Sequence, residues 1–301
     1  MRRIAFALLA ACVAAAPAAA APGDRALEDV RVLSSDAMQG RLAGSEGAAG
    51  ARLYILGRLR EIGLEPTGQA FTFRRRNGEE VTGTNLMARI PGATSGGRAI
   101  VVTAHYDHLG VRGGQVFNGA DDNASGVAGL LAVAEAFKAR APRHDVWIVF
   151  LDAEEMGLQG ARAFLDKPPV PVARIALNIN FDMLSKNARG ELYAAGGSTQ
   201  PFVRTVLETM VPDAPATLRL GHDTGPLDSV DNWTTQSDHG PFAEAGIAWV
   251  YFGVEDHPEY HKPTDDFATI PPDFFRRSVD TVVIAARRFD LQLDSLPERA
   301  P

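Results

Sequence analysis

Buried-type apolar runs alternate with helical patterns along most of the chain. Continuous apolar stretches predict buried strands at residues 98–104, 145–151, 174–181 and 247–252. Helical spacing predicts helices at 25–33, 46–62, 126–139, 158–165, 200–210 and 272–290. Residues 69–76 and 84–90, which flank the turn-forming pair Asn77-Gly78, predict a hairpin. This alternation indicates an α/β protein, a three-layer α/β/α sandwich around a mostly parallel, mixed sheet.

The first 21 residues have the pattern of an export signal. Arg2 and Arg3 precede an apolar stretch at 4–13, and the small-residue run 14–21 offers A-x-A cleavage sites. We therefore expect a signal peptide over 1–21, an exported protein that is periplasmic or secreted, and a single domain over 22–301. A membrane anchor is the alternative, but the segment is mostly alanine and is interrupted by Pro17.

The only cysteine of the chain, Cys12, lies within this segment. The sequence Leu9-Ala10-Ala11-Cys12 resembles a bacterial lipoprotein box, so lipid anchoring at Cys12 is an open alternative, although the apolar stretch before it is very short. Cleavage after residue 20 or 21 would leave no cysteine, and the mature protein would then need no disulfide bond.

Composition is that of an ordinary globular protein. The 301 residues are 46% hydrophobic and 22% charged, with a formal net charge of -7. An acidic balance of this kind argues against a nucleic-acid partner and against an anionic membrane surface.

Side chains able to bind metals follow three of the predicted core strands. His105 and Asp107 follow the first, Glu154 and Glu155 the second, and Asp182 the third. Open α/β sheets place ligands at the carboxyl ends of their strands, so these side chains are expected to converge at one edge.

Two later groups extend the set, one at 237–239 and one holding Tyr260, His261 and Asp265. Imidazole and carboxylate groups without a thiol suit Zn²⁺, and also Co²⁺ or Mn²⁺. Five ligands are too many for one tetrahedral zinc that keeps an open position. They suit two metals that share a bridging carboxylate.

Six motifs in order resemble the family-28 zinc metallopeptidases, which include bacterial leucyl-type and aminopeptidase S-like two-zinc aminopeptidases. They are HYDHLG (105–110), GADDNASG (119–126), DAEEMGLQGA (152–161), NFDM (180–183), SDHGPF (237–242) and YHKPTDD (260–266). The resemblance covers about residues 30–290. It implies the zinc-exopeptidase (phosphorylase/hydrolase-like) fold. The stretch 77–98 is too short for the protease-associated domain that larger relatives insert.

The resemblance also implies a metal-ligand set. His105 and Asp182 would bind one zinc, Glu155 and His261 the other, and Asp122 would bridge them, with a cis peptide after it. Neighbouring candidates compete for two of these positions. Asp121 is better explained as a residue that caps the approach to a helix, and His257 has no Asp four residues on, whereas His261 has Asp265.

Further roles follow from the same resemblance. Glu154 would be the general base, since a carboxylate beside the metals takes a proton from water and returns it to the leaving amine. Asp107 would orient His105 and Asp265 would orient His261. Tyr260 matches a tyrosine that, in some relatives, hydrogen-bonds the tetrahedral intermediate.

Three other features are less specific. His108 and His239 fit a pocket lining and an ordinary structural role equally well. The basic run at 74–76 is typical of an exposed strand on the predicted hairpin.

These residues predict an aminopeptidase that acts on peptides with a free N-terminus. The alternatives within the fold are a glutaminyl-peptide cyclase, which uses a single zinc, and a carboxypeptidase or dipeptidase. A non-catalytic binding ectodomain is a further alternative, and the intact ligand set argues against it.

Overall fold

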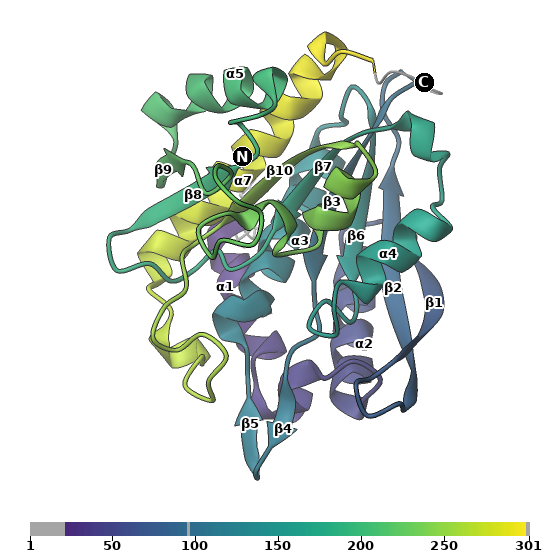
Figure 1. The fold of residues 1–301 in the computed structure, drawn as a ribbon, viewed down its shortest axis with the longest axis vertical. Helices are drawn as coiled ribbons and strands as arrows, with labels where there is room; N and C mark the ends of the chain where they lie inside the picture. Colours follow the sequence, from purple (N-terminus) through teal and green to yellow (C-terminus); the bar gives the residue numbers. More distant parts are fainter. Residues whose placement is uncertain (1–21, 95–96, 299–301) are drawn as a thin grey trace, which may run out of the picture.

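The computed structural model describes residues 22–94 and 97–298, whose centre is a sheet of eight strands (Figure 1). From one edge to the other the strands are β1 (Thr67–Arg74), β2 (Glu80–Ile90), β6 (Asp145–Leu151), β3 (Ala99–His105), β7 (Ile175–Phe181), β10 (Ala248–Gly253), β8 (Glu191–Ala195) and β9 (Thr217–Leu220). The central strands β6, β3, β7 and β10 are parallel, whereas β2 and β8 pair antiparallel with them. The predicted mixed, mostly parallel sheet is confirmed.

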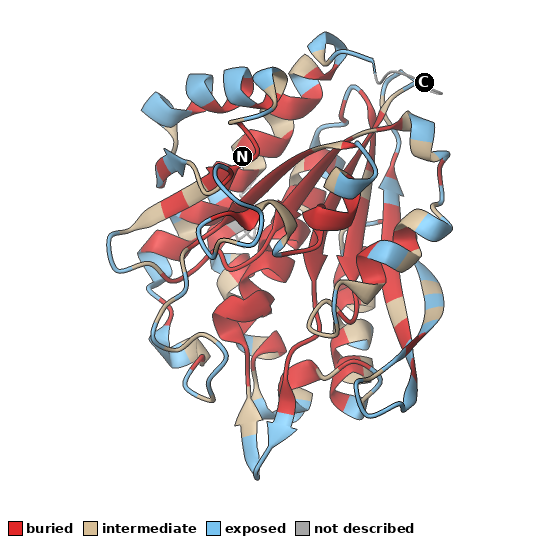
Figure 2. Cartoon of the chain, in the orientation of Figure 1, coloured by how far each residue is buried: buried red, intermediate tan, exposed pale blue. Residues whose placement is uncertain are grey.

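Helices cover both faces of this sheet. The larger layer holds α1 (Pro22–Leu33), α2 (Glu46–Glu61), α3 (Gly126–Ala139), α5 (Pro201–Met210) and α7 (Pro272–Gln292), while α4 (Gln159–Asp166) and α6 (His239–Glu244) cover the other face. Figure 2 shows the central strands buried throughout and the outer helices buried on their inner sides. The three-layer α/β/α prediction is therefore confirmed.

Alternating side chains of β3 pack against the helices on the two faces of the sheet. Ile100 and Val102 pack into the larger core, while Val101 packs into the smaller one. Thr103 on the smaller side donates a hydrogen bond of 2.6 Å to Asn180 of β7. This polar contact between neighbouring strands lies two residues before the carboxyl end, where the candidate chemistry begins.

The elements that the sequence did not predict are short or partly exposed. They are β4 (Gly110–Arg112), β5 (Gln115–Phe117), β8, β9 and α6. Strands of three to five residues give too few alternating positions for a period of two to stand out.

The predicted signal peptide and Cys12 lie outside the described residues, so these predictions stay predictions. Within 22–94 and 97–298, the helices are all too short or too polar to cross a bilayer.

Arg41 joins segments that are far apart in the sequence. Its side chain is fully buried, and its guanidinium donates hydrogen bonds of 2.7 to 2.9 Å to the carbonyl oxygens of Leu33, Tyr106, Asn118 and Gly119. The end of α1, the segment after β3 and the loop that leads to Asp122 are thus held by one group. Burial lowers the pKa of Arg41 to about 10, while nearby carboxylates oppose that shift, so it stays charged at neutral pH.

Replacing Arg41 tests this role. We expect Arg41→Met to lower the free energy of unfolding by about 3–5 kcal/mol, because four buried carbonyl groups lose a charged donor. Urea denaturation followed by circular dichroism measures the change. Arg60→Met in α2 is the matched control, since Arg60 is exposed. Equal stability of the two variants would contradict the role.

Candidate active site

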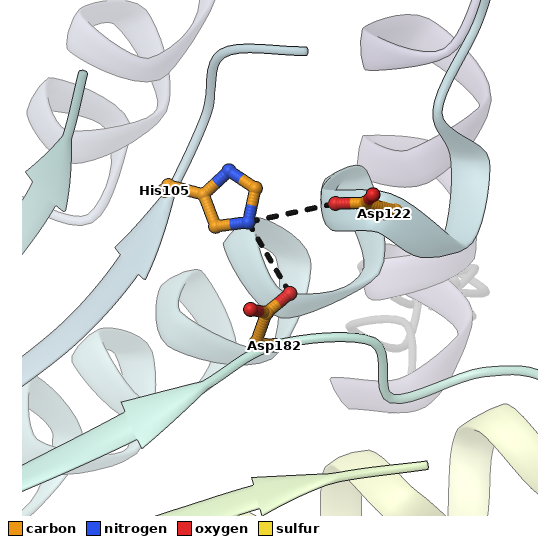
Figure 3. A group of neighbouring side chains, drawn as sticks. All are labelled: His105, Asp122 and Asp182. Atoms are coloured by element: carbon orange, nitrogen blue, oxygen red, sulfur yellow. Dashed lines mark hydrogen bonds and ion pairs between the residues drawn. The ribbon is translucent and has the colours of Figure 1, made fainter. Parts of the chain in front are cut away.

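The first group of candidate ligands lies at the carboxyl ends of β3 and β7. His105 is the last residue of β3, and its Nε2 is 3.2 Å from Oδ1 of Asp182, which follows β7. The same Nε2 is 3.5 Å from Oδ1 of Asp122, in the irregular turn before α3. Figure 3 shows the three side chains pointing toward one another, so three donors converge on one point.

A second group shares Asp122 with the first. Nε2 of His261 lies 3.1 Å from Oδ2 of Asp122 and 3.4 Å from Oε2 of Glu155. The two oxygens of Asp122 therefore face different histidines, His105 on one side and His261 on the other. The peptide bond after Asp122 is cis, as the family resemblance implies.

His108 also belongs to this second group. Its Nδ1 is 2.8 Å from Oε1 of Glu155 and 3.7 Å from Oδ2 of Asp122, and the side chain is fully buried. Gly119 leaves room for the ring, because a Cβ there would come within 2.5 Å of it. The sequence alone favours neither a pocket lining nor a structural role for His108. A histidine three residues past His105, after a strand end, was the available signal.

Positive backbone φ angles occur at, or directly beside, several of these site residues. Ala153, directly before Glu154, has a φ of 57°, and Met183, directly after Asp182, has a φ of 61°. His261 itself has a φ of 54°. Non-glycine residues seldom adopt positive φ, and such residues gather where function requires a particular side-chain direction.

Asp107 joins two parts of the site. Its carbonyl oxygen lies 3.2 Å from Nδ1 of His105 and its carboxylate 3.6 Å away, so both face the nitrogen opposite the convergence point. The carboxylate also accepts hydrogen bonds from the backbone N–H groups of Glu154, at 3.0 Å, and Glu155, at 3.4 Å. Asp107 therefore positions His105 and the glutamate pair together.

Asp265 has a different set of contacts from the one predicted. Its fully buried carboxylate accepts hydrogen bonds of 3.0 to 3.1 Å from the backbone N–H groups of Asp121 and Asp122, instead of orienting His261. Successive turns after Glu259 and Lys262 carry it beneath that loop. Asp265 thus supports the shared carboxylate of Asp122.

Asp121 and His257, the two competing candidates for metal ligands, contact each other instead. Oδ1 of Asp121 accepts hydrogen bonds from Ser125 and from the backbone and hydroxyl of Ser185, and Oδ2 lies 3.0 Å from Nε2 of His257. The polar atoms of Asp121 and His257 therefore bind each other and neighbouring residues, and not the two groups of candidate metal ligands.

The motif at 237–239 contributes support that the sequence did not assign. The hydroxyl of Ser237 donates 2.7 Å to Oδ2 of Asp182 and accepts 2.9 Å from Asn180. Asp238 is fully buried, and burial raises the pKa of its carboxyl to about 8. His239 hydrogen-bonds the carbonyl of Trp233 and packs against two aromatic rings, which is a structural role.

Glu154 and Glu155 differ in environment although they are neighbours. Burial raises the pKa of Glu154 well above its ordinary value, and nearby carboxylates add to this rise although His105 opposes it. Burial would also raise the pKa of Glu155, but its hydrogen bonds from His108 and His261 outweigh burial and lower it.

A cavity of about 330 Å³ lies at this site. It is lined by Glu154 and the five candidate metal ligands, together with Gly157, Leu158, Thr235, Gln236 and Tyr260. A larger cavity of about 1080 Å³ opens at the amino ends of the strands. Its two arginines, Arg98 and Arg174, are bonded to carbonyl groups and to Asp145. The candidate metal ligands therefore line the smaller cavity.

The donor set fits divalent metal binding. Asp122 lies within 4.8 Å of Asp182 in one group and of Glu155 in the other, and all three carboxylates are largely withdrawn from water, which opposes their charges unless cations accompany them. Imidazole nitrogens and carboxylate oxygens form two groups of three, His105 with Asp122 and Asp182, and His108 with Asp122 and Glu155. Both are suited to zinc.

The parallel core of the sheet and this donor cluster define a hydrolase of the metallopeptidase class. The sequence model described as peptidase family M28 matches residues 85–286, and the chain belongs to that family.

Individual relatives agree with this membership. Aminopeptidase YwaD of Bacillus subtilis (strain 168) is 30% identical over 196 residues, which are 62% of this chain and 40% of the relative. A vacuolar membrane protease of Clavispora lusitaniae is 27% identical over 186 residues, 62% of this chain and 16% of that protein. The chain thus spans less than half the length of these curated relatives.

Solved structures show the same fold. BSAP, a zinc aminopeptidase from Bacillus subtilis, has a TM-score of 0.73 at 18% identity, covering 88% of this chain and 94% of that one. Glutaminyl cyclase of Porphyromonas gingivalis also has a TM-score of 0.73, at 20% identity, covering 88% of this chain and 97% of that one. The fold alone therefore does not separate the two activities.

The contact between His108 and Glu155 leads to a prediction about metal affinity. We expect His108→Leu to weaken zinc binding at the second group by about 10- to 100-fold, because Glu155 loses the side chain that holds Oε1. Competition with a fluorescent zinc chelator measures the affinity. His108→Asn, which keeps a donor near Nδ1, should lose less. Unchanged affinity in His108→Leu, with unchanged folding, would rule out this role.

Proposed function

We propose that this protein is a two-zinc aminopeptidase that removes N-terminal residues from peptides, with Glu154 as the general base. His105 and Asp182 would hold one zinc, Glu155 and His261 the other, and Asp122 would bridge the two. When bound, the pair would lower the pKa of water and polarise the scissile carbonyl. The predicted signal peptide over 1–21 supports an exported enzyme.

The division between Glu154 and Glu155 is the observation that carries this proposal. The carboxylate of Glu155 is engaged by His108 and His261. The carboxylate of Glu154 lines the same cavity and makes no hydrogen bond or ion pair with any other side chain in the described ranges. A carboxylate that is beside the ligands but is not one of them is free to take a proton from water and return it to the leaving amine.

Tyr260 is suited to stabilise negative charge on the substrate. Its ring stacks on His261, with centroids 3.9 Å apart, and it lines the cavity. Burial raises the pKa of Tyr260 and the carboxylate of Asp122 raises it further, so the hydroxyl remains protonated at neutral pH. It can therefore donate a hydrogen bond to the carbonyl oxygen as that oxygen gains negative charge.

The charge of the cavity favours the amino end of a peptide. In this proposal the zinc ions balance the charges of Asp122, Glu155 and Asp182, and Glu154 is the remaining acidic side chain of the lining. A carboxylate in that position attracts a free α-ammonium group. Internal peptide bonds offer no such group. A glutaminyl cyclase has the same fold, but the two donor groups around Asp122 support two metals, whereas cyclases use one.

Removing the base should separate catalysis from metal binding. We expect Glu154→Gln to lower kcat by about 10²- to 10⁴-fold while zinc content stays unchanged, because only proton transfer is lost. Elemental analysis and initial rates on a leucyl chromogenic substrate measure both quantities. Glu155→Gln is the matched control and should lose zinc. Wild-type turnover in Glu154→Gln would refute the assignment.

Metal content and substrate choice test the activity itself. We expect two zinc ions per chain, loss of activity on chelation, and recovery with Zn²⁺, Co²⁺ or Mn²⁺. Aminoacyl substrates with a free amine should be hydrolysed, and the same substrates should resist hydrolysis when the amine is acetylated. One zinc per chain, with cyclisation of an N-terminal glutaminyl peptide, would favour the cyclase. Hydrolysis of the acetylated peptide from its C-terminus would favour a carboxypeptidase.

A further inference from the structure

Arg76 brings a positive charge to a cavity that is also lined by four carboxylates. It lies in the turn between β1 and β2 and lines the cavity beside Gly157 and Leu158. Among the residues that line this cavity within the described ranges, it is the only arginine or lysine. Arg76 is exposed, as the basic run at 74–76 predicts, but its place in the lining of this cavity was not apparent from the sequence.

The neighbouring arginines are paired and Arg76 is not. Arg74 binds Glu80 at 3.0 Å, and Arg75 binds Glu79 at 2.8 Å and the carbonyl of Ala43 at 2.8 Å. The guanidinium of Arg76 makes no hydrogen bond or ion pair with any residue of 22–94 or 97–298. Five donors on a fixed plane are therefore available to a ligand.

The hairpin that carries Arg76 is fixed to the catalytic loop. Phe73 and Val81 of the hairpin form a small apolar cluster with Ala153, which precedes Glu154, and Met156 of the same loop packs against it. The backbone N–H of Thr84 also donates 2.8 Å to Asp152, at the start of that loop. The backbone that carries Arg76 and the loop of the glutamate pair are thus packed together, which keeps Arg76 next to the cavity that it lines.

We propose that Arg76 binds a carboxylate of the substrate, so that the enzyme favours short peptides whose negative charge reaches the mouth of the cavity. Arginine presents a fork that matches a carboxylate with two parallel hydrogen bonds. A cavity of about 330 Å³ is at the small end of ligand sites, which suits a short peptide. This inference rests on the proposed function and adds a substrate class to it.

Two sources can supply that carboxylate, the C-terminus of a dipeptide or an acidic side chain. Two matched pairs separate them. Leucyl-glycine and leucyl-glycinamide differ only in the terminal carboxylate. Leucyl-glutamyl α-amide and leucyl-glutaminyl α-amide differ only in the side-chain carboxylate.

The test measures binding and turnover separately. Dissociation constants are measured by calorimetry on zinc-loaded protein in the Glu154→Gln background, and kcat/KM is measured on the enzyme with Glu154 intact. We expect the acid of at least one pair to bind about tenfold more tightly than its amide, as one charge-assisted contact allows. Arg76→Gln should remove this preference, and Arg76→Lys should keep part of it because the charge remains without the fork.

Arg74→Gln is the matched control, since it removes a paired arginine from the same hairpin and should leave the preference unchanged. No preference for either acid, or a preference that survives in Arg76→Gln, would overturn the proposal. If the intact enzyme hydrolysed none of the peptides, the aminopeptidase proposal would fail. Calorimetry would still decide whether Arg76 recognises a carboxylate.

Discussion

Crowding of buried carboxylates at one edge of the sheet is the constraint around which the structure is organised. Like charges this close repel one another, and burial removes the water that would otherwise screen them. Two of the supporting carboxylates, Asp107 and Asp265, are stabilised by hydrogen bonds from backbone N–H groups, whereas the buried carboxylate of Asp238 has no hydrogen-bond partner among the described residues. Asp107 accepts hydrogen bonds from the backbone N–H groups of Glu154 and Glu155, and Asp265 accepts them from those of Asp121 and Asp122. On the candidate metal-ligand carboxylates, the oxygens that face the histidines are left for cations.

The rest of the fold brings the candidate metal ligands together from distant parts of the chain. Parallel pairing of β6, β3 and β7 sets three strand ends side by side, which no local interaction could do. The guanidinium of Arg41 then fixes the segments that leave β3 and approach Asp122. A chain of side-chain hydrogen bonds runs from Thr103 through Asn180 and Ser237 to Asp182. The positions of the candidate ligands are therefore properties of the sheet and its supports.

Much of this arrangement could be predicted from the sequence, because strand ends are visible in the hydrophobic pattern. His105 and Asp182 follow apolar runs, and parallel pairing makes their convergence an expected outcome. Contacts made by irregular loops were harder to predict. The family resemblance pairs Asp265 with His261, four residues away, yet successive turns direct its carboxylate to the loop of Asp122. The position of Arg76 depends on tertiary packing of the hairpin, which periodicity does not encode.

Two adjacent glutamates have separate environments because the chain turns sharply between a strand and a helix. The positive φ of Ala153 ends the extended path of β6, and Asp107 fixes the next two backbone N–H groups. Side chains that would alternate across a regular strand then diverge within one turn. Glu155 contacts the histidines, whereas Glu154 lines the cavity without such a contact. The roles proposed for Glu155 and Glu154, a metal ligand and a base, require two carboxylates that are near each other but differently directed. An irregular turn provides this, whereas a regular strand would place them on opposite faces.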